Sequence, residues 1–278
     1  MSNKRTLSVI VVILVLFGVL ITTVSAEYAI VSGKCSNWAK EELDQANDLW
    51  VIPDKLLDVD LTQPITRLEF ATISVKAYEQ LSGMTAWPAS NPFTDTDDPE
   101  VLKALNVGIT TGVSADKFEP NELLTREQIA TMLTRVLKKS LFPNWTIKTD
   151  SDFALSYAKQ LPFDDDNQIS DWAKDSVYFM AANGIINGVG NNKFVPKISL
   201  NEEGVNGNAT LEEAIIIASR MVDKFEDDEI IADILKEIDN SEDSNNVGSE
   251  LDGVDTEFED DETDETDENE AFFDTFFD

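Results

Sequence analysis

A threefold repeat of one capped helix start is the feature that most constrains how this chain can fold. In the segment 124–137, Thr125 can cap a helix through its side-chain oxygen, and Gln128 can bond back to the capping residue's own N–H. The same pairing occurs twice more, as Thr66 with Glu69 and as Thr210 with Glu213. Since one such unit cannot bury its apolar face alone, the three units are expected to pack together.

Apolar residues follow each cap at the spacing of one helical face. The face of the second unit comprises Ile129, Met132, Leu133, Val136 and Leu137. Those of the first and third units comprise Phe70, Ile73, Ala77, Tyr78 and Leu81, and Ile216, Ile217, Met221 and Val222. Arg126 and Glu127 fall between the capping pair of the second unit, where we expect an exposed first turn.

A second motif precedes two of the capped helices. Gly-Ile-x-x-Gly-Val-x-x-x-Lys-Phe-x-Pro spans 108–120 and returns at 184–196 with no gap. Pro-Phe-x-Asp stands upstream of each copy, at 92–95 and 162–165. The first unit is a variant, because Trp50-Val51-Ile52-Pro53 occupies the place of the glycine motif. The third unit has nine extra residues between its Pro and its capping Thr, which indicates a surface loop.

These motifs resemble those of S-layer homology repeats over residues 36–225. The resemblance implies a mainly α fold, in which three helix-loop-helix repeats form a pseudo-threefold unit around a central three-helix bundle. It also implies non-covalent attachment to secondary cell-wall polymer, an acidic and often pyruvylated glycan, through grooves between neighbouring repeats. The glycan-binding residues that it implies are Arg67, Arg126, Gly108, Gly112, Gly184 and Gly188.

An arginine in the first turn of a helix is poorly explained by helix stability, because anionic side chains are preferred near the positive end of the helix dipole. Its planar guanidinium can instead hold a carboxylate in two hydrogen bonds. An ion pair with an Asp or Glu of a neighbouring repeat is the alternative. Leu211 replaces the arginine in the third unit while the cap persists. We therefore interpret the arginine as dispensable for folding and predict no ordinary groove at the third unit.

The composition argues against several classes of function. A net charge of −33 disfavours nucleic acid and anionic membranes as partners. Without histidine, the chain cannot form a Ser-His-Asp or Cys-His nucleophile or a His-ligated metal site. Residues 58–69 fit an EF-hand loop poorly, because Gln63 stands where the turn requires glycine. We predict no enzyme, metal or cofactor, and the single Cys35 permits no intramolecular disulfide.

The two ends of the chain differ from the repeats. Residues 1–26 have the charged, apolar and small-residue regions of a cleavable signal peptide, so no membrane contact is expected after cleavage. Residues 226–278 contain 24 Asp or Glu and one Lys, a composition typical of disorder. The connection 141–161 fits either two short strands or a packed loop. The expected domains are a signal peptide, 1–26, three repeats, 27–90, 91–160 and 161–226, and an acidic, largely disordered tail, 227–278.

The sequence thus predicts a secreted protein that binds a wall glycan at the cell wall or S-layer surface of a Gram-positive-type bacterium. The alternative function is a surface adaptor. In that case the tail recruits another secreted protein through the aromatic residues at 271–278, or binds Ca²⁺ weakly.

Overall fold

The computed structural model describes residues 33–158, 161–197, 208–227 and 230–232. Its α-helices are α2 (Lys40–Asp48), α3 (Arg67–Ser82), α4 (Pro99–Asn106), α5 (Arg126–Leu141), α6 (Asp171–Ala182) and α7 (Leu211–Phe225). Three short 3₁₀ helices are η1 (Asp54–Leu56), η2 (Ile147–Phe153) and η3 (Asp166–Gln168). The prediction of a mainly α fold is confirmed. The expected signal peptide, the third-unit insertion at 198–207 and the tail beyond residue 232 lie outside the described residues.

Local sequence sets where the three long helices begin. In each capping Thr the backbone is extended and the side chain accepts a hydrogen bond from the amide three residues later. The side chain of that later residue accepts a hydrogen bond from the backbone N–H of the Thr in return. The predicted capping boxes of α3, α5 and α7 are therefore all confirmed.

The starts of these three helices are joined by a closed ring of backbone hydrogen bonds. Ile65 N–H donates to the carbonyl of Ala209 at 2.9 Å, and Leu124 N–H donates to the carbonyl of Ile65 at 3.1 Å. Ala209 N–H donates to the carbonyl of Leu124 at 3.3 Å and completes the ring. Each of the three residues immediately precedes a capping Thr, so the ring relates the units by a pseudo-threefold axis.

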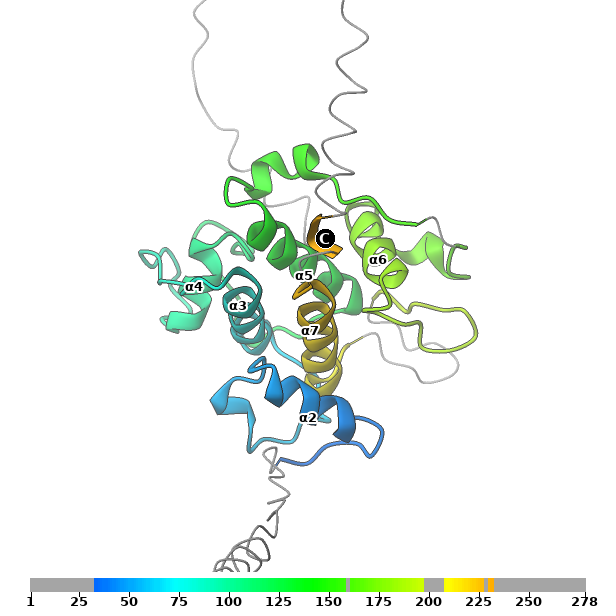
Figure 1. Ribbon diagram of the computed structural model, residues 1–278. Helices are drawn as coiled ribbons and strands as arrows, with labels where there is room; N and C mark the ends of the chain where they lie inside the picture. The colour runs from blue at the N-terminus through cyan, green and yellow to red at the C-terminus, as the bar shows by residue number, and fades with distance from the viewer. Residues whose placement is uncertain (1–32, 159–160, 198–207, 228–229, 233–278) are drawn as a thin grey trace, which may run out of the picture. The chain divides into compact units, whose positions relative to one another are not determined.

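Around this ring, α3, α5 and α7 pack against one another (Figure 1). The predicted apolar faces are buried in the core that they share, apart from Leu81, which is partly buried. The short helix of each unit packs on the long helix of the preceding one: α4 on α3, α6 on α5 and α2 on α7. Neighbouring units therefore interlock, and each junction between them is a place where loops and helix starts meet.

The first unit closes its loop without the glycine of the other two. Gly108 and Gly184 follow α4 and α6 with φ of 80° and 71°, and Trp50 follows α2 with φ of 57°. Trp50 N–H donates to the carbonyl of Asn47, as the two glycines do to residues three positions earlier. A left-handed conformation costs a non-glycine residue roughly 1–2 kcal/mol. Trp50 is 74% exposed, so its burial does little to offset that cost.

The connection after α5 forms no strand among the described residues 142–158. It contains η2, and its Trp145 is only 1% exposed. Phe153 packs against Phe142 with ring centroids 5.1 Å apart. The packed-loop alternative for 141–161 is thus correct in the described part, and the strand alternative is wrong. None of the described helices is long and apolar enough to span a membrane.

Candidate functional site

Arg67 joins the first unit to the glycine-motif loop of the second. Its Nε donates to the carbonyl of Phe118 at 2.9 Å, and its Nη2 donates to the carbonyl of Thr111 at 3.4 Å. Its guanidinium also lies over the Phe118 ring, 4.9 Å from the ring centroid, within the range of a cation–π contact. The partners lie 51 and 44 positions away in the sequence, so only the folded chain brings them together.

Arg126 makes the same contacts one unit later. Its Nε donates to the carbonyl of Phe194 at 3.0 Å and its Nη2 to the carbonyl of Asn187 at 2.7 Å. Its guanidinium lies 5.2 Å from the centroid of the Phe194 ring. The two arginines thus occupy equivalent positions at successive junctions, because their partners are equivalent residues of the two glycine-motif loops.

The expectation that Arg126 and Glu127 lie in an exposed first turn is wrong. Arg126 is 6% exposed and Glu127 is 3% exposed, since the loop of the third unit covers this turn. Arg67 is 3% exposed, and burial lowers its pKa to about 10. Burial also lowers the pKa of Arg126, while the charges of Glu213 and Asp165 oppose that shift. The interpretation of the arginine as dispensable for folding does not agree with contacts that join two units.

The alternative role of the arginine, an ion pair with an acidic residue of a neighbouring repeat, is seen at Arg126 only as a long contact. Nη1 of Arg126 lies 3.9 Å from Oε1 of Glu213, which is too long for a hydrogen bond. The firm partners of the guanidinium are the two backbone carbonyls. Its third nitrogen is therefore held by charge attraction rather than by a short directional contact.

Sequence reasoning missed an acidic contact at the second junction, between the second and third units, and at the third, between the third and first. Glu127 accepts hydrogen bonds from the backbone N–H and the hydroxyl of Ser170, at 2.9 and 3.0 Å, just before α6. Glu212 accepts one from the N–H of Ser36 at 2.8 Å, before α2. Burial raises the pKa of Glu127, and the hydrogen bonds from Ser170 oppose that rise. Both glutamates stand two residues after a capping Thr, which was the available signal.

Aspartates of the Pro-Phe-x-Asp motif hold the glycine-motif loops. Asp95 accepts hydrogen bonds from the amides of Phe118 and Glu119, at 3.0 and 2.9 Å. In the third unit, Asp165 accepts from the amides of Phe194 and Val195, both at 2.8 Å. Glu119 and Val195 have φ of 58° and 55°, so the aspartates fix a turn that contains a left-handed residue.

A cavity of about 350 Å³ lies beside Arg126, between all three units. Asn187 and Gly188 of the third-unit loop line one part of it, together with Val189. Glu213 and Arg220 contribute from α7, with aliphatic side chains of the same helix. Trp38 of the first unit completes the lining and is 56% exposed. The cavity therefore combines two guanidinium groups, one carboxylate and one exposed indole ring.

Arg220 is held in place by Glu42 of α2. Its Nε and Nη2 donate to the two carboxylate oxygens, at 2.6 and 2.7 Å, in the paired geometry that suits a guanidinium and a carboxylate. Its Nη1 lies 3.4 Å from the carbonyl of Ile185. The side chain of Arg220 is 32% exposed, so its charge reaches the cavity. Such a site suits an anionic group placed next to a ring that can lie on Trp38.

The sequence-predicted site residues are only partly brought together. Arg126 and Gly188 line the cavity, whereas Arg67, Gly108, Gly112 and Gly184 are not among its described lining residues. Gly112 and Gly188 lie where loop backbones approach closely, since an added Cβ would meet the carbonyl oxygen of Lys117 at 2.6 Å or of Lys193 at 2.8 Å. Gly108 and Gly184 terminate helices with positive φ.

Sequence reasoning did not select Trp38 or Arg220. Trp38-Ala-Lys is repeated as Trp172-Ala-Lys, and Arg220 follows its capping Thr at the spacing at which Arg135 follows Thr125. Those repeats were the available signals. In the described part of the chain, no group of three or more His, Cys, Asp or Glu is placed to hold a metal ion.

Comparison with known families agrees with these repeated contacts. The model of the S-layer homology domain matches residues 92–130 and 162–197, which contain both glycine motifs and both Pro-Phe-x-Asp motifs. The chain carries S-layer homology domains. The matched ranges fall in the second and third units. The first unit lies outside them, yet α3 has the same capping box and the same place in the hydrogen-bonded ring.

The chain is also similar to parts of several curated proteins. It is 27% identical over 195 residues to an exoglucanase, XynX, of Acetivibrio thermocellus, covering 68% of this chain and 16% of that protein. It is 26% identical over 195 residues to an amylopullulanase of Thermoanaerobacterium thermosulfurigenes, covering 68% and 9%. An endoglucanase of Bacillus sp. (strain KSM-635) is 27% identical over 139 residues, covering 49% and 13%. The matched part is thus less than a fifth of each relative.

Proposed function

We propose that this protein is secreted and attaches non-covalently to secondary cell-wall polymer, with the cavity beside Arg126 as a binding groove. Attachment to the cell envelope is the function that the S-layer homology domains support. The observation that carries the choice of site is the meeting of Arg126, Arg220 and the exposed Trp38 in one cavity. The proposed ligand is an acidic, pyruvylated sugar of the polymer.

The charges of the cavity favour such a ligand. Among the described residues, the ion-pair partner of Nη1 of Arg126 is the carboxylate of Glu213 at 3.9 Å, so the carboxylate of a sugar can approach that nitrogen. Partial burial strengthens the attraction, because the site has a lower effective dielectric constant than water. Trp38 offers an apolar face for the sugar ring. The guanidinium would provide the selectivity for acid and the indole the contact area.

The other two junctions between units differ in whether an arginine follows the capping Thr. Arg67 repeats the position of Arg126 and is proposed to serve a second groove, which Gly108 and Gly112 shape. At the third junction Leu211 replaces the arginine and is 3% exposed, so no guanidinium from that position can reach a ligand. We therefore propose binding at the first two junctions and none of the same kind at the third.

Since this chain matches less than a fifth of each relative, the activities named for those proteins are not proposed for it. We propose that the present chain shares with them an attachment role and has no catalytic activity of its own. A surface adaptor is the second candidate. Its supporting observation is the acidic segment with paired aromatic residues at 271–278, which lies outside the described structure.

Sedimentation with purified cell walls tests the proposal. Trp38→Ala is the informative change, because the indole is 56% exposed and contributes little to the core, whereas replacing Arg126 would also break contacts between units. We expect wall binding by the full chain to weaken about tenfold, as for loss of a contact worth about 1.4 kcal/mol. Trp87→Ala, at a residue 71% exposed and outside the cavity, is the matched control.

Two further arms separate the candidates. Walls stripped of pyruvyl groups should retain the parent chain poorly, and deletion of residues 240–278 should leave retention unchanged. Equal binding of Trp38→Ala and the parent would refute the site. Loss of retention on deleting the tail would instead support the adaptor.

A further inference from the structure

A hollow of about 220 Å³ lies where the last turns of α3 and α7 meet the end of α2. The capping boxes stand at the opposite ends of α3 and α7. The apolar residues that line the hollow are Leu49, Trp50, Leu81, Val222, Phe225 and Ile231. We call this surface the Trp50 hollow. It shares no lining residue with the cavity beside Arg126.

Trp50 is the unusual member of this lining. Its φ of 57° is strained for a non-glycine residue, yet its side chain is 74% exposed. Such strain persists where the surrounding structure enforces it and is concentrated at positions with a function. An exposed indole beside the buried Val222 and Phe225 also offers an apolar surface to a partner. The Trp50 hollow therefore has the properties of a docking surface.

The threefold relation between the units indicates what covers such a surface. After α3, the chain crosses α4, the short helix that packs on α3. The N–H of Ala89 donates to the carbonyl of Leu102 at 3.0 Å, and Nδ2 of Asn106 donates to the carbonyl of Trp87 at 2.9 Å. Leu102 and Asn106 both belong to α4. The chain that leaves the first long helix is therefore fixed along the short helix packed on it.

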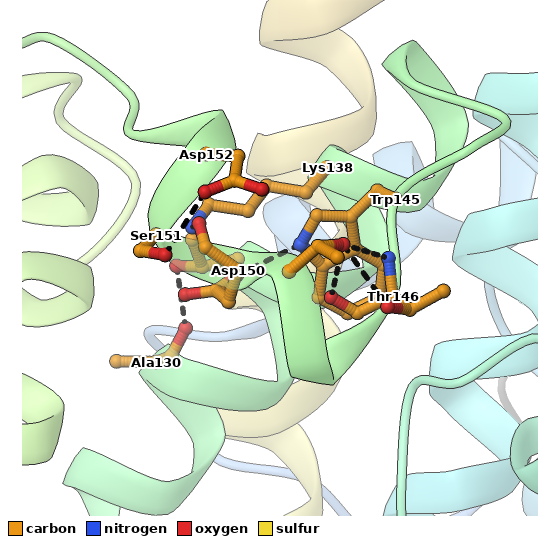
Figure 2. A network of polar contacts seen from close by, with 9 residues as sticks. Ala130, Lys138, Trp145, Thr146, Asp150, Ser151 and Asp152 are labelled. Carbon is orange, nitrogen blue, oxygen red and sulfur yellow. Dashed lines mark hydrogen bonds and ion pairs between the residues drawn. The ribbon is translucent and has the colours of Figure 1, made fainter. Parts of the chain in front are cut away.

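The chain that leaves α5 is placed in the same way against α6, the short helix that packs on α5. Tyr157 of this connection packs against Phe179 of α6, with ring centroids 6.4 Å apart. A polar network holds the connection (Figure 2), since Nζ of Lys138 and the indole N–H of Trp145 both donate to Oδ1 of Asp150, at 2.7 and 2.8 Å. Two of the three long helices are thus followed by a segment that covers the short helix packed on them.

The third long helix, α7, has α2 packed on it as its short helix. Beyond α7, the described residues 230–232 lead toward α2, because Ile230 packs on the core and Ile231 lines the Trp50 hollow. The amides of both residues donate to the carbonyl of Asp227, at 3.1 and 3.2 Å. The hollow therefore lies on the course of the chain as it leaves α7.

Apolar residues continue in the sequence beyond this point. The spacing of one helical face is followed by Ile230, Ile231, Ile234, Leu235 and Ile238. Asp233 and Lys236 fall on the opposite face of the same pattern. Residues 233–239 lie outside the described structure. An apolar face of this kind needs a surface on which to pack, and Ile231, near its start, already lies at the Trp50 hollow.

We propose that residues 233–239 of this chain dock in the Trp50 hollow, with Ile234, Leu235 and Ile238 against the indole ring. Ile234 stands three residues after Ile231, a rise of about 5 Å in a helix, so the segment reaches the hollow without a linker. A segment tethered so closely acts at an effective concentration on the order of 1 mM, which favours it over a second copy of the chain. The docked segment would cover α2 as the preceding connections cover α4 and α6.

Nuclear magnetic resonance tests this docking in the full chain, labelled with ¹⁵N and, at the isoleucine δ1-methyl groups, with ¹³C. We expect nuclear Overhauser contacts between the Trp50 ring and the methyl group of Ile234 or Ile238. Ile234→Ser combined with Ile238→Ser should move the Trp50 indole signal. Asp233→Ser combined with Lys236→Ser changes the opposite face, also without altering the net charge, and is the matched control that should leave this signal in place.

The contacts in the unsubstituted chain decide the proposal whether or not the substitutions disturb the fold. The proposal is overturned if the Trp50 ring contacts neither methyl group, or if it contacts the aromatic rings at 271–278 instead. A mixture of labelled and unlabelled chains detects a second copy, and contacts that pass only between different chains would also overturn it. Cell walls take no part in this experiment, so its failure and that of the proposed function are distinguishable.

Discussion

Replacing Arg67 with alanine should destabilise the fold, even though Arg67 stands where the sequence pattern alone suggests a ligand-binding residue. The change removes the donor to the Phe118 carbonyl at 2.9 Å, a longer contact to Thr111 at 3.4 Å and the cation–π contact at 4.9 Å. It also leaves the Phe118 carbonyl without this donor. The junction between the first and second units therefore loses its arginine contacts.

The expected loss follows from these contacts. A hydrogen bond from a charged donor contributes about 1.5–3 kcal/mol, and a cation–π contact contributes about 1 kcal/mol. The substitution also removes a desolvated charge, whose cost is visible in the pKa of Arg67 lowered to about 10. We therefore expect the free energy of unfolding to fall by about 2–3 kcal/mol, toward the lower end of the summed contacts.

Urea unfolding followed by tryptophan fluorescence and by far-ultraviolet circular dichroism measures this loss. Coincident transitions would establish that unfolding is two-state. Lys40→Ala, at an exposed lysine of α2, is the matched control and should lie within about 0.5 kcal/mol of the parent. A loss below about 0.5 kcal/mol for Arg67→Ala would refute the structural role of the arginine and restore the view that folding does not need it.

The two kinds of glycine in the repeated loops should respond differently to alanine. Gly112→Ala would place its Cβ 2.4 Å from the carbonyl oxygen of Ser114 and should lower the free energy of unfolding by about 3 kcal/mol or more. The Cβ of Gly184→Ala meets no atom within 4 Å, so this change should cost only about 1 kcal/mol, for its φ of 71°. Equal losses of stability in thermal unfolding would contradict this prediction. Glu127→Gln should change how stability depends on pH, because burial raises the pKa of Glu127 above its ordinary value of 4.5. Its contribution is then present below that value and is lost as pH rises through the folded-state pKa. The stability of the parent minus that of Glu127→Gln should therefore fall as pH rises above 4.5, and a difference that grew with pH would count against the buried carboxylate.

Features made by contacts between neighbouring residues in the chain were predictable from the sequence, whereas features made by contacts between distant residues were not. The capping boxes of α3, α5 and α7 were predictable, because every atom in each box lies within four consecutive residues. The apolar faces were predictable for the same reason, since helical periodicity is a local property. The expected exposure of Arg126 and Glu127 failed because the loop that covers them comes from another unit.

By itself, the sequence determined that three like helices exist, where each begins, and which two units carry the glycine motif. Only the tertiary structure decided what the arginines contact and which side chains share a cavity. Trp38 and Arg220 come from opposite ends of the folded region, and Arg220 is held by Glu42 across 178 positions. The closure of the backbone ring at Ile65, Leu124 and Ala209 places the third unit beside the first, and no local pattern in a linear chain encodes that contact.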